Sequence, residues 1–566
     1  MKIDLRARPF YLDDEAAAWV EHTRDAMTVE DKVGQLFCVL FKQAVPSELE
    51  YVLGILKPGG CMYRVVSAER AVSFTQALQG ALNIPPLIAA NLEKGGNGIV
   101  EEGTLLGSPM EVAATDSVDM AVKLAEVCGK EGRAVGANWA FAPIIDIDAN
   151  FRSPITNTRT FGNDPVRVRE MGAAYTRKIQ ELGLAASIKH FPGDGQDERD
   201  QHLVTTINSM DCEAWMETYG AAYRACIEAD ALTCMVGHIM QPAWSRRLDS
   251  RLADRDILPA SLSKELMGGL LRGELGFNGL IVTDATTMAG YTIPMSRRLA
   301  VPASIAAGAD MFLFARNLEE DYGFMMEGVR SGVITPERLN EAVTRILAVK
   351  AALGLHLGKP GPDLEQAKRV VGCEQHLQWS RDCADRAITL VKEEAGVLPI
   401  TPERYPRILF YPIEPPAGGE GNYKVTAACG MLKERLIKEG FQVDTFVPQP
   451  YGEGFTTKYE EMVGQYDLML YAANLSTKSN QTVVRIEWKQ PMGADCGHYL
   501  NDVPTVFVSL ENPYHLLDFP RIRTYINCYS NNDRVLDALV EKLTGRSLFT
   551  GKSPVDPFCG KWDTRL

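Results

Sequence analysis

The sequence predicts an α/β protein with two domains: a (β/α)8 TIM-type barrel followed by a smaller α/β domain, an αβα sandwich. Three observations support this fold class. The chain has 566 residues, which is too long for one core of the usual ~100–200 residues. Apolar runs of strand length alternate with helix-period segments, and several of those runs end in polar residues. We expect the barrel at residues 1–355, a linker at 356–375 and the second domain at 376–566.

Eight short apolar runs lie in the first 320 residues and are the expected barrel strands. They are Val33–Phe41, Gly59–Arg64, Pro86–Glu93, Trp139–Asp146, Ala185–Phe191, Leu232–Ile239, Leu280–Asp284 and Asp310–Ala315. Their unbroken apolar character is typical of parallel strands that are buried on both faces. Helix-period segments such as Ser117–Ala134, Pro165–Leu182 and Ser261–Leu271 lie between them. Strands that alternate with helices predict βαβ units and hence a barrel.

A Gly- and Pro-rich stretch, Gly354–Asp363, follows a strong helical pattern at Pro336–Leu353 and is the expected linker. A second alternation begins after it. Its expected strands are Arg407–Tyr411, Tyr466–Tyr471, Thr505–Leu510 and Thr524–Tyr529, and its expected helices are Val425–Glu439 and Asp533–Thr544. This pattern predicts an open α/β sandwich of about 180 residues.

Composition narrows the class of partner. Lys and Arg number 59 against 73 Asp and Glu, so the net charge is 59 − 73 = −14. So acidic a chain lacks the basic surface that nucleic acid or an anionic membrane requires. We therefore expect neither as a partner, whereas neutral ligands such as sugars remain possible. Whether the chain forms a homo-oligomer is left open.

The cysteines and the N-terminus predict a cytoplasmic protein. The 12 cysteines are scattered without a CxxC pair, which favours reduced thiols. The first 20 residues contain no apolar signal region, and no run of about 18 apolar residues occurs. The eight histidines form no metal-ligand spacing, so we expect no metal and no cofactor.

The most informative stretch is Lys189–His202, KHFPGDGQDERDQH, at the end of the fifth expected strand. Asp200 and His202 are two residues apart, so in an extended loop their side chains point the same way. A carboxylate beside an imidazole orients the ring and favours its protonated form, which makes a proton donor. The alternative is a solvated charged loop, and composition alone favours that alternative.

Two more stretches place polar groups after strands. In Gly279–Thr287, Asp284 ends the seventh strand, where a carboxylate can act as a nucleophile; alternatively it caps the next helix. In Asp146–Pro165, Arg159 can grip hydroxyl groups of a ligand, or else the segment is a structural loop with a surface ion pair.

Taken in order, "FAPIIDID…NTRTFGNDP", "KHFPGDG…DQH" and "LIVTDA" resemble glycoside hydrolase family 3, in its β-N-acetylglucosaminidase-like branch. The resemblance covers nearly the whole chain. It implies that Asp284 is the nucleophile, and that His202 is the acid/base supported by Asp200. It further implies that other residues hold the sugar in subsite −1, namely Lys189, His190 and Arg159.

One departure from the branch concerns the end of the third strand. There the branch has Asp-Gln-Glu-Gly-Gly-Arg, whereas this chain has Asn91, followed by Leu-Glu-Lys-Gly-Gly-Asn. Asn91 can still hydrogen-bond sugar hydroxyls but carries no charge, and Glu93 is expected to compensate. The identity of the sugar therefore stays open.

The expected function is that of a retaining, exo-acting hydrolase of terminal β-linked N-acetylglucosamine, a β-N-acetylhexosaminidase, working through a covalent glycosyl-Asp intermediate. The alternatives within enzymes are a β-glucosidase and a β-glycoside phosphorylase. An imidazole base carries no negative charge and would not repel phosphate. The alternative outside enzymes is a non-catalytic carbohydrate-binding member of the family.

Overall fold

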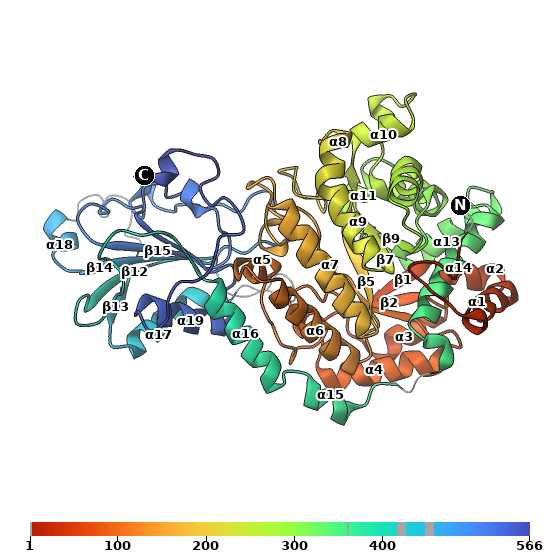
Figure 1. Ribbon diagram of the computed structural model, residues 1–566, viewed down its shortest axis with the longest axis horizontal. Helices are drawn as coiled ribbons and strands as arrows, with labels where there is room; N and C mark the ends of the chain where they lie inside the picture. Colours follow the sequence, from red (N-terminus) through yellow and green to blue (C-terminus); the bar gives the residue numbers. More distant parts are fainter. Residues whose placement is uncertain (1–2, 359–360, 416–425, 448–457) are drawn as a thin grey trace. The chain divides into compact units, whose positions relative to one another are not determined.

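The computed structural model describes residues 3–358, 361–415, 426–447 and 458–566. The chain groups into two compact units (Figure 1). The first comprises residues 1–106, 121–150 and 165–377, and the second comprises residues 107–120, 151–164 and 378–566. Each unit is described below by itself.

The first unit is a parallel eight-stranded barrel, so the predicted fold class is confirmed. Its strands lie in the order β10-β1-β2-β3-β4-β5-β7-β9, and a parallel bridge between Val282 and Met311 joins the two ends of the sheet. The strands are β1 (Phe37–Phe41), β2 (Gly60–Tyr63), β3 (Leu87–Ala90), β4 (Trp139–Ala140), β5 (Ala185–Phe191), β7 (Thr233–Val236), β9 (Leu280–Thr283) and β10 (Phe312–Leu313). Each lies inside one of the eight expected runs.

Helices follow the barrel strands, and many begin at side-chain caps. Ser67, for example, caps α4, and Thr335 caps α14. The helices of this part are α1 (Asp14–Ala26), α2 (Val29–Gln35), α3 (Pro46–Leu53), α4 (Ala68–Ala81), α6 (Val118–Ala134), α7 (Pro165–Glu181), α8 (Cys212–Trp215), α9 (Ala221–Glu228), α10 (Pro242–Leu248), α11 (Ala289–Thr292), α12 (Arg297–Ala307), α13 (Leu318–Arg330), α14 (Pro336–Ala352) and α15 (Leu364–Val370). Two short strands, β6 (Thr206–Ile207) and β8 (Ile239–Met240), form a separate parallel pair.

Two elements differ from the sequence-based expectation: one strand begins later, and one helix is divided in two. The run Val33–Phe41 opens as helix, because Thr28 accepts a hydrogen bond from the Asp31 N–H and starts α2, so the strand begins only at Phe37. The expected helix Ser261–Leu271 divides into a 3-10 turn, Ala260–Leu262, and a π-helix, Glu265–Glu274. The Ser263 side chain accepts from the Leu266 N–H at the division.

The second unit is built on a six-stranded sheet in the order β11-β16-β15-β14-β12-β13. All neighbours are parallel except β11 and β16. The strands are β11 (Thr389–Lys392), β12 (Arg407–Ile413), β13 (Gln442–Thr445), β14 (Leu468–Ala473), β15 (Thr505–Ser509) and β16 (Thr524–Asn527). The expectation missed β11 and β13, the two edge strands, because they are short and polar-rich.

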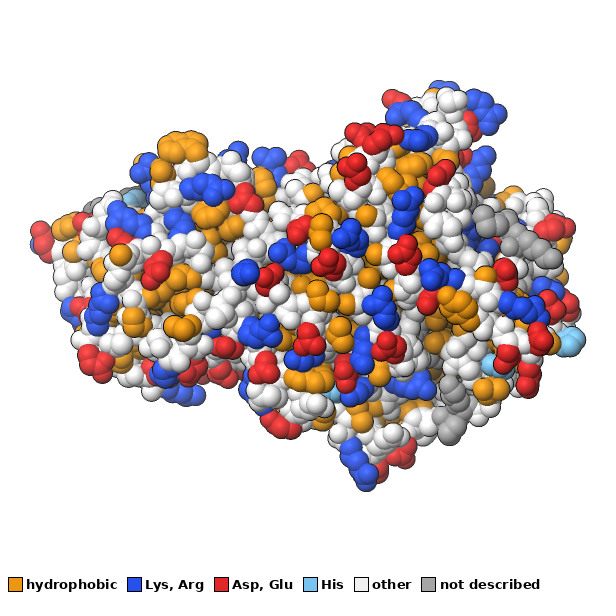
Figure 2. Space-filling view, viewed as in Figure 1, with side chains coloured by type: hydrophobic (Ala, Val, Ile, Leu, Met, Phe, Trp, Pro, Cys, Tyr) orange, Lys and Arg blue, Asp and Glu red, His pale blue; other side chains and the backbone are white. Residues whose placement is uncertain are grey.

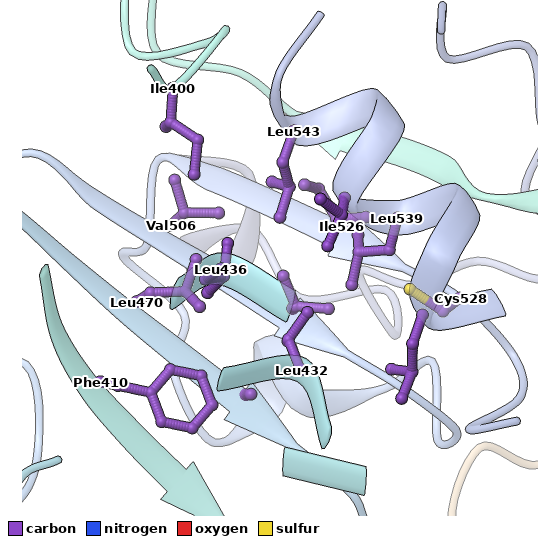
Figure 3. Close-up of a cluster of buried hydrophobic side chains, with 14 of the residues drawn as sticks. Ile400, Phe410, Leu432, Leu436, Leu470, Val506, Ile526, Cys528, Leu539 and Leu543 are labelled. Carbon is purple, nitrogen blue, oxygen red and sulfur yellow. The ribbon is translucent and has the colours of Figure 1, made fainter. Parts of the chain in front are cut away.

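Successive residues of the central strands face opposite sides of this sheet and fill two cores. Phe410, Leu470 and Val506 pack with α17 (Ala428–Lys438) and α19 (Asp533–Leu543) on one side (Figure 3). Tyr411 and Tyr471 stack on the other side, with ring centroids 4.1 Å apart. Both faces are therefore buried, as expected of an αβα sandwich. Its further helices are α5 (Pro109–Ala114), α16 (Glu374–Ala387), which begins in the first unit, and α18 (Tyr459–Val463).

The expected domain boundaries at 355 and 376 stay predictions. Residues 359–360 of the expected linker, and Val425 at the start of an expected helix, lie outside the described residues. None of the described helices is both long and apolar enough to cross a membrane. On the face that Figure 2 shows, acidic and basic side chains are interspersed.

Candidate active site

Asp284 is held at the carboxyl end of β9. Its N–H donates to the Val236 carbonyl of β7 at 2.8 Å, so the backbone of Asp284 is still part of the barrel ladder. Its Oδ1 accepts from the Ala285 N–H at 2.7 Å, and Oδ2 is left for other partners. The side chain is therefore fixed in the mouth of the barrel, where TIM-barrel enzymes build their active sites.

Histidines set the electrostatics of Asp284. His190 Nε2 lies 3.9 Å from Asp284 Oδ2. Burial by itself raises the pKa of Asp284, but His190, His238 and His202 more than offset it, and the pKa is lowered overall. Asp284 is therefore an ionised, partly desolvated carboxylate, as a carboxylate nucleophile must be.

Asp146, at the end of the β4 run, fixes His190. His190 Nδ1 donates to Asp146 Oδ2 at 2.7 Å, and the His190 backbone N–H donates to Asp146 Oδ1 at 3.0 Å. The N–H of Asp194 also donates to Oδ1, at 2.8 Å. With Nδ1 engaged, Nε2 is the ring nitrogen that faces Asp284 and a ligand.

Lys189 of β5 and Glu93, which follows β3, form an ion pair at the mouth. Lys189 Nζ lies 2.7 Å from Glu93 Oε1, and the two side chains are 3% and 12% exposed. Asn91 precedes Glu93 directly after β3 and is half-buried. In the order of the barrel strands, β3 stands four places from β9, so Asn91 lies across the mouth from Asp284.

His202 and Asp200 form a hydrogen-bonded dyad on the loop after β5. His202 Nδ1 donates to Asp200 Oδ1 at 2.7 Å, and the Asp200 carboxylate also accepts the His202 N–H at 2.9 Å. The Asp200 side chain is fully buried whereas that of His202 is 27% exposed, so Nε2 is accessible for proton transfer.

Two attachments hold this loop beside β9. The Ala289 N–H, at the start of α11, donates to the His202 carbonyl at 3.0 Å. Thr206, at the end of the loop, donates its N–H to the His238 carbonyl at 3.2 Å. The structure thus brings five predicted residues together at the ends of β5 and β9, namely Asp284, His202, Asp200, Lys189 and His190. Asn91 and Glu93 both follow β3, and Glu93 reaches this group through its ion pair with Lys189.

Arg159, the remaining predicted site residue, lies in the short 3-10 helix Asn157–Arg159 of the second unit. Asn157 of the same turn donates to Asn512 Oδ1 at 3.0 Å. The role of Arg159 stays a prediction.

Sequence reasoning noted Asp146 and His238 as polar residues at strand ends, and Asp146 as able to grip a ligand, but it did not include either among the predicted site residues. His238 is fully buried, where its Nδ1 lies 2.9 Å from Ser261 Oγ and its Nε2 donates to the Ala285 carbonyl at 3.1 Å. Burial lowers the pKa of His238. Both residues lie at or near the ends of expected strands, which was the signal, but their partners come from other strands. No group of three or more His, Cys, Asp or Glu among the described residues is arranged to hold a metal ion.

Comparison with known proteins places this geometry in a family. The Glycosyl hydrolase family 3 N terminal domain matches residues 28–349. The chain belongs to glycoside hydrolase family 3. It is therefore an enzyme of the glycoside hydrolase class, and the resemblance drawn from its motifs is confirmed.

Similar proteins cover the whole chain. A β-N-acetylglucosaminidase/β-glucosidase of Cellulomonas fimi is 52% identical over 564 residues, which is 100% of both chains. A solved structure of the β-glucoside phosphorylase BglX is 44% identical, with a TM-score of 0.93 over 99% of both chains. A family 3 β-N-acetylglucosaminidase from Paenibacillus sp. str. FPU-7 shares the fold at 24% identity, with a TM-score of 0.78 over 95% of this chain and 100% of that one.

Proposed function

We propose that this enzyme removes terminal β-linked N-acetylglucosamine or glucose from glycosides, with retention of configuration. One observation carries the proposal: an ionised, buried Asp284 at the end of β9, with histidines around it and the His202–Asp200 dyad on a loop attached to the segment that follows it. The similarity to the Cellulomonas fimi enzyme, whose name includes both sugars, supports this choice of substrates.

In the first step Asp284 Oδ2 attacks C1 of the sugar and displaces the aglycone oxygen. His202 Nε2 gives its proton to that oxygen. Asp200 holds the opposite ring nitrogen and stabilises the charged ring before it transfers the proton. His190 Nε2 and Lys189 hold sugar hydroxyls, and their partners Asp146 and Glu93 keep both side chains in place.

In the second step an acceptor attacks C1 from the side that the aglycone left, and the bond between C1 and Asp284 breaks. His202, now neutral, takes a proton from water if water is the acceptor. The product keeps the β configuration because C1 is inverted twice.

Phosphorolysis is the second candidate function. A neutral imidazole does not repel an anionic acceptor as a second carboxylate would, and the 44% identity to a β-glucoside phosphorylase supports this alternative. Phosphate would then attack C1 and give a glycosyl phosphate.

The test of the proposal replaces the nucleophile. Asp284→Asn should reduce turnover of 4-nitrophenyl β-glycosides by at least about a thousandfold, and a 2-fluoro glycoside should label Asp284 in the wild-type enzyme. Turnover of the variant near the wild-type rate, or a label on another residue, would rule out the assignment. Wild-type products made with and without phosphate, separated by chromatography, distinguish hydrolysis from phosphorolysis.

A further inference from the structure

Gln201, the residue between Asp200 and His202, takes no part in the steps described above, yet its side chain is buried. Gln201 is only 1% exposed, although it lies on the loop that carries the dyad. A side-chain amide has one acceptor oxygen and two N–H donors, and burying such a group without hydrogen-bond partners is costly. The partners of the Gln201 amide therefore show what this side chain does.

The Gln201 amide joins the ends of two barrel strands. Its Nε2 donates to Oδ2 of Asp194, which follows β5, at 3.2 Å. Its Oε1 accepts the backbone N–H of His238, which follows β7, at 2.8 Å. The Asp194 carboxylate is itself held, because its Oδ1 accepts the Gly195 N–H at 2.8 Å. Gln201 is thus attached to the two segments that leave β5 and β7.

The dyad and Gln201 belong to one tight turn, residues 200–204. The Asp200 carbonyl accepts the N–H groups of Leu203 and Val204 at 3.0 and 3.1 Å. The Asp200 carboxylate accepts both the backbone N–H and the ring Nδ1–H of His202. Because these bonds make the turn a unit, a side chain that fixes Gln201 also fixes the position of the His202 ring.

Two glycines allow the barrel backbone to approach this turn closely. A Cβ at Gly290, in the first turn of α11, would lie 2.4 Å from the Gln201 carbonyl oxygen and 2.8 Å from that of Val204. A Cβ at Gly237, just before His238, would lie 3.0 Å from Gln201 Oε1. All three distances are shorter than the roughly 3.5–4.0 Å of a favourable non-bonded contact. The turn therefore lies directly on the segments that follow β7 and β9, and a methyl group there would displace it.

An uncharged side chain suits position 201, because carboxylates lie near it. Burial raises the pKa of Asp194, and the charges of Asp146 and Asp200 raise it further. A carboxylate at position 201 would add another negative charge beside Asp194, whereas an amide donates a hydrogen bond without carrying a charge. Gln201 therefore attaches the turn without altering the charge that Asp200 presents to His202.

We propose that Gln201 is a positioning residue for the acid/base: its amide holds the turn, and so His202, at the distance from the glycosidic oxygen that proton transfer requires. The inference rests on the proposed function, because it takes His202 to be the acid/base. Proton transfer needs heavy atoms about 2.6–3.2 Å apart, and a displacement of about 1 Å can cost about 10²-fold in rate. Gln201 exchanges no proton and acts only through His202.

Gln201→Met tests the proposal, because methionine fills a similar space without an amide. The kcat/KM for a methyl β-glycoside, whose leaving group needs protonation, should fall by about 10–100-fold. Labelling by a dinitrophenyl 2-fluoro glycoside, which needs Asp284 but no proton donor, should stay within about twofold of the wild-type rate. The readout is the ratio of the two rates, which a merely destabilised enzyme would not change.

Gln180→Met is the matched control. Gln180 of α7 also uses both amide atoms: its Nε2 donates to the Asp230 carbonyl at 2.7 Å, and its Oε1 accepts the Leu232 N–H at 2.8 Å. Leu232 directly precedes β7, so these hydrogen bonds lie at the amino end of the strand, away from the candidate site. Gln180→Met should leave the ratio of the two rates unchanged, whatever it does to the melting temperature.

Gly290→Ala is a second variant, because it keeps the Gln201 amide but adds a Cβ that displaces the turn. It should lower the same ratio. Gly323→Ala on α13 is its control, since a Cβ there meets no atom of the described residues beyond its own helix within 4 Å. An unchanged ratio in Gln201→Met, shown to be folded by circular dichroism, would overturn the proposal. If Gln201→Met does not fold, an unchanged ratio in Gly290→Ala would overturn it likewise.

A double-mutant cycle shows whether Gln201 acts through His202. In a His202→Ala enzyme, Gln201→Met should cause no further loss beyond about twofold on the methyl β-glycoside, because the group that it positions is already gone. A further loss of about tenfold or more would show that Gln201 acts by another route and would overturn the proposal.

The same variants separate this inference from the proposed function. If His202→Ala shows no selective loss on the methyl β-glycoside, the acid/base assignment fails and the inference fails with it. If His202→Ala shows that loss and Gln201→Met does not, only the role of Gln201 is overturned.

Discussion

At the scale of single residues, the ionisation of Asp284 depends on a competition between burial and charge. Burial raises the pKa of this carboxyl, and the histidines His190, His238 and His202 lower it by more. The balance keeps Asp284, the proposed nucleophile, charged where burial alone would favour the neutral acid.

Removing His190 should therefore shift the pH dependence of the enzyme. In His190→Gln the pKa of Asp284 rises, because the neighbour that most lowers this pKa is lost while burial remains. A smaller fraction of Asp284 is then ionised at acid pH, so the acidic limb moves to higher pH. The rate of labelling by a 2-fluoro glycoside, measured against pH, checks this. His22→Gln on the exposed part of α1 is the control, and identical acidic limbs in wild type and His190→Gln would contradict the interpretation.

His202→Ala should discriminate between leaving groups. Substrates with poor leaving groups should lose about 10²–10⁴-fold in rate, since they need protonation. A nitrophenolate leaves without it, so the glycosyl-enzyme should accumulate. Added azide, which needs no base, should then restore turnover and yield a β-glycosyl azide, detected by mass spectrometry. Equal losses on both kinds of substrate with no azide rescue would show that His202 is not the acid/base.

At the scale of elements, a buried charge cluster ties β10 to its neighbours. Asp310, fully buried just before β10, accepts from Arg272 and Arg338, each at 2.6 Å, and from the Ile281 N–H at 2.9 Å. Burial raises the pKa of Asp310, but the nearby arginines lower it overall. This cluster joins the last strand of the barrel to β9, where the sheet closes.

Asp310→Asn should destabilise the barrel by about 3–5 kcal/mol, because it leaves buried guanidinium groups without a counter-charge. Because the pKa of Asp310 is lowered in the folded state, its contribution is present above the unfolded pKa and is lost as the pH falls through the folded pKa. The difference in melting temperature between variant and wild type should therefore shrink at acid pH.

Asp254→Asn is the matched control, because Asp254 also pairs with an arginine but the pair is exposed. The side chain of Asp254 is 92% exposed and that of its partner Arg246 is 45% exposed. This variant should melt as the wild type does. Equal melting temperatures for Asp310→Asn and the wild type at neutral pH would disprove the role given to the cluster.

At the scale of the whole molecule, the second unit takes two segments from the barrel part of the sequence, residues 107–120 and 151–164. Within that unit Met110 and Ala114 pack in a buried cluster with Tyr514, Tyr529 and Val555. Ser108 Oγ also donates to the Tyr529 carbonyl at 2.9 Å.

A chain shortened to residues 1–377 should therefore be poorly soluble, because it keeps Met110 and Ala114 but loses their packing partners. Co-expression of residues 378–566 should recover soluble protein. Soluble yield and size-exclusion chromatography measure this, and a soluble, monomeric 1–377 chain would contradict it.

The sequence alone determined where the barrel strands lie along the chain, and it predicted the segments of the candidate site. Parallel strands that are buried on both faces are apolar throughout, so the eight runs could be recognised. Polar residues at the ends of such strands are costly to bury without partners, which marks them as candidates for a site. The motifs around Lys189, His202 and Asp284 were readable because each is local. Edge strands β11 and β13 were not, since one exposed side removes the apolar signal.

Only the tertiary structure decided which strand ends meet. His190 hydrogen-bonds Asp146, which follows the preceding barrel strand, 44 residues away in sequence. His238 hydrogen-bonds the Ala285 carbonyl, which follows the next barrel strand, 47 residues away. Such pairings depend on how the strands close into a barrel. Closure is decided by many weak contacts between distant parts of the chain, so no local sequence pattern predicts the pairings.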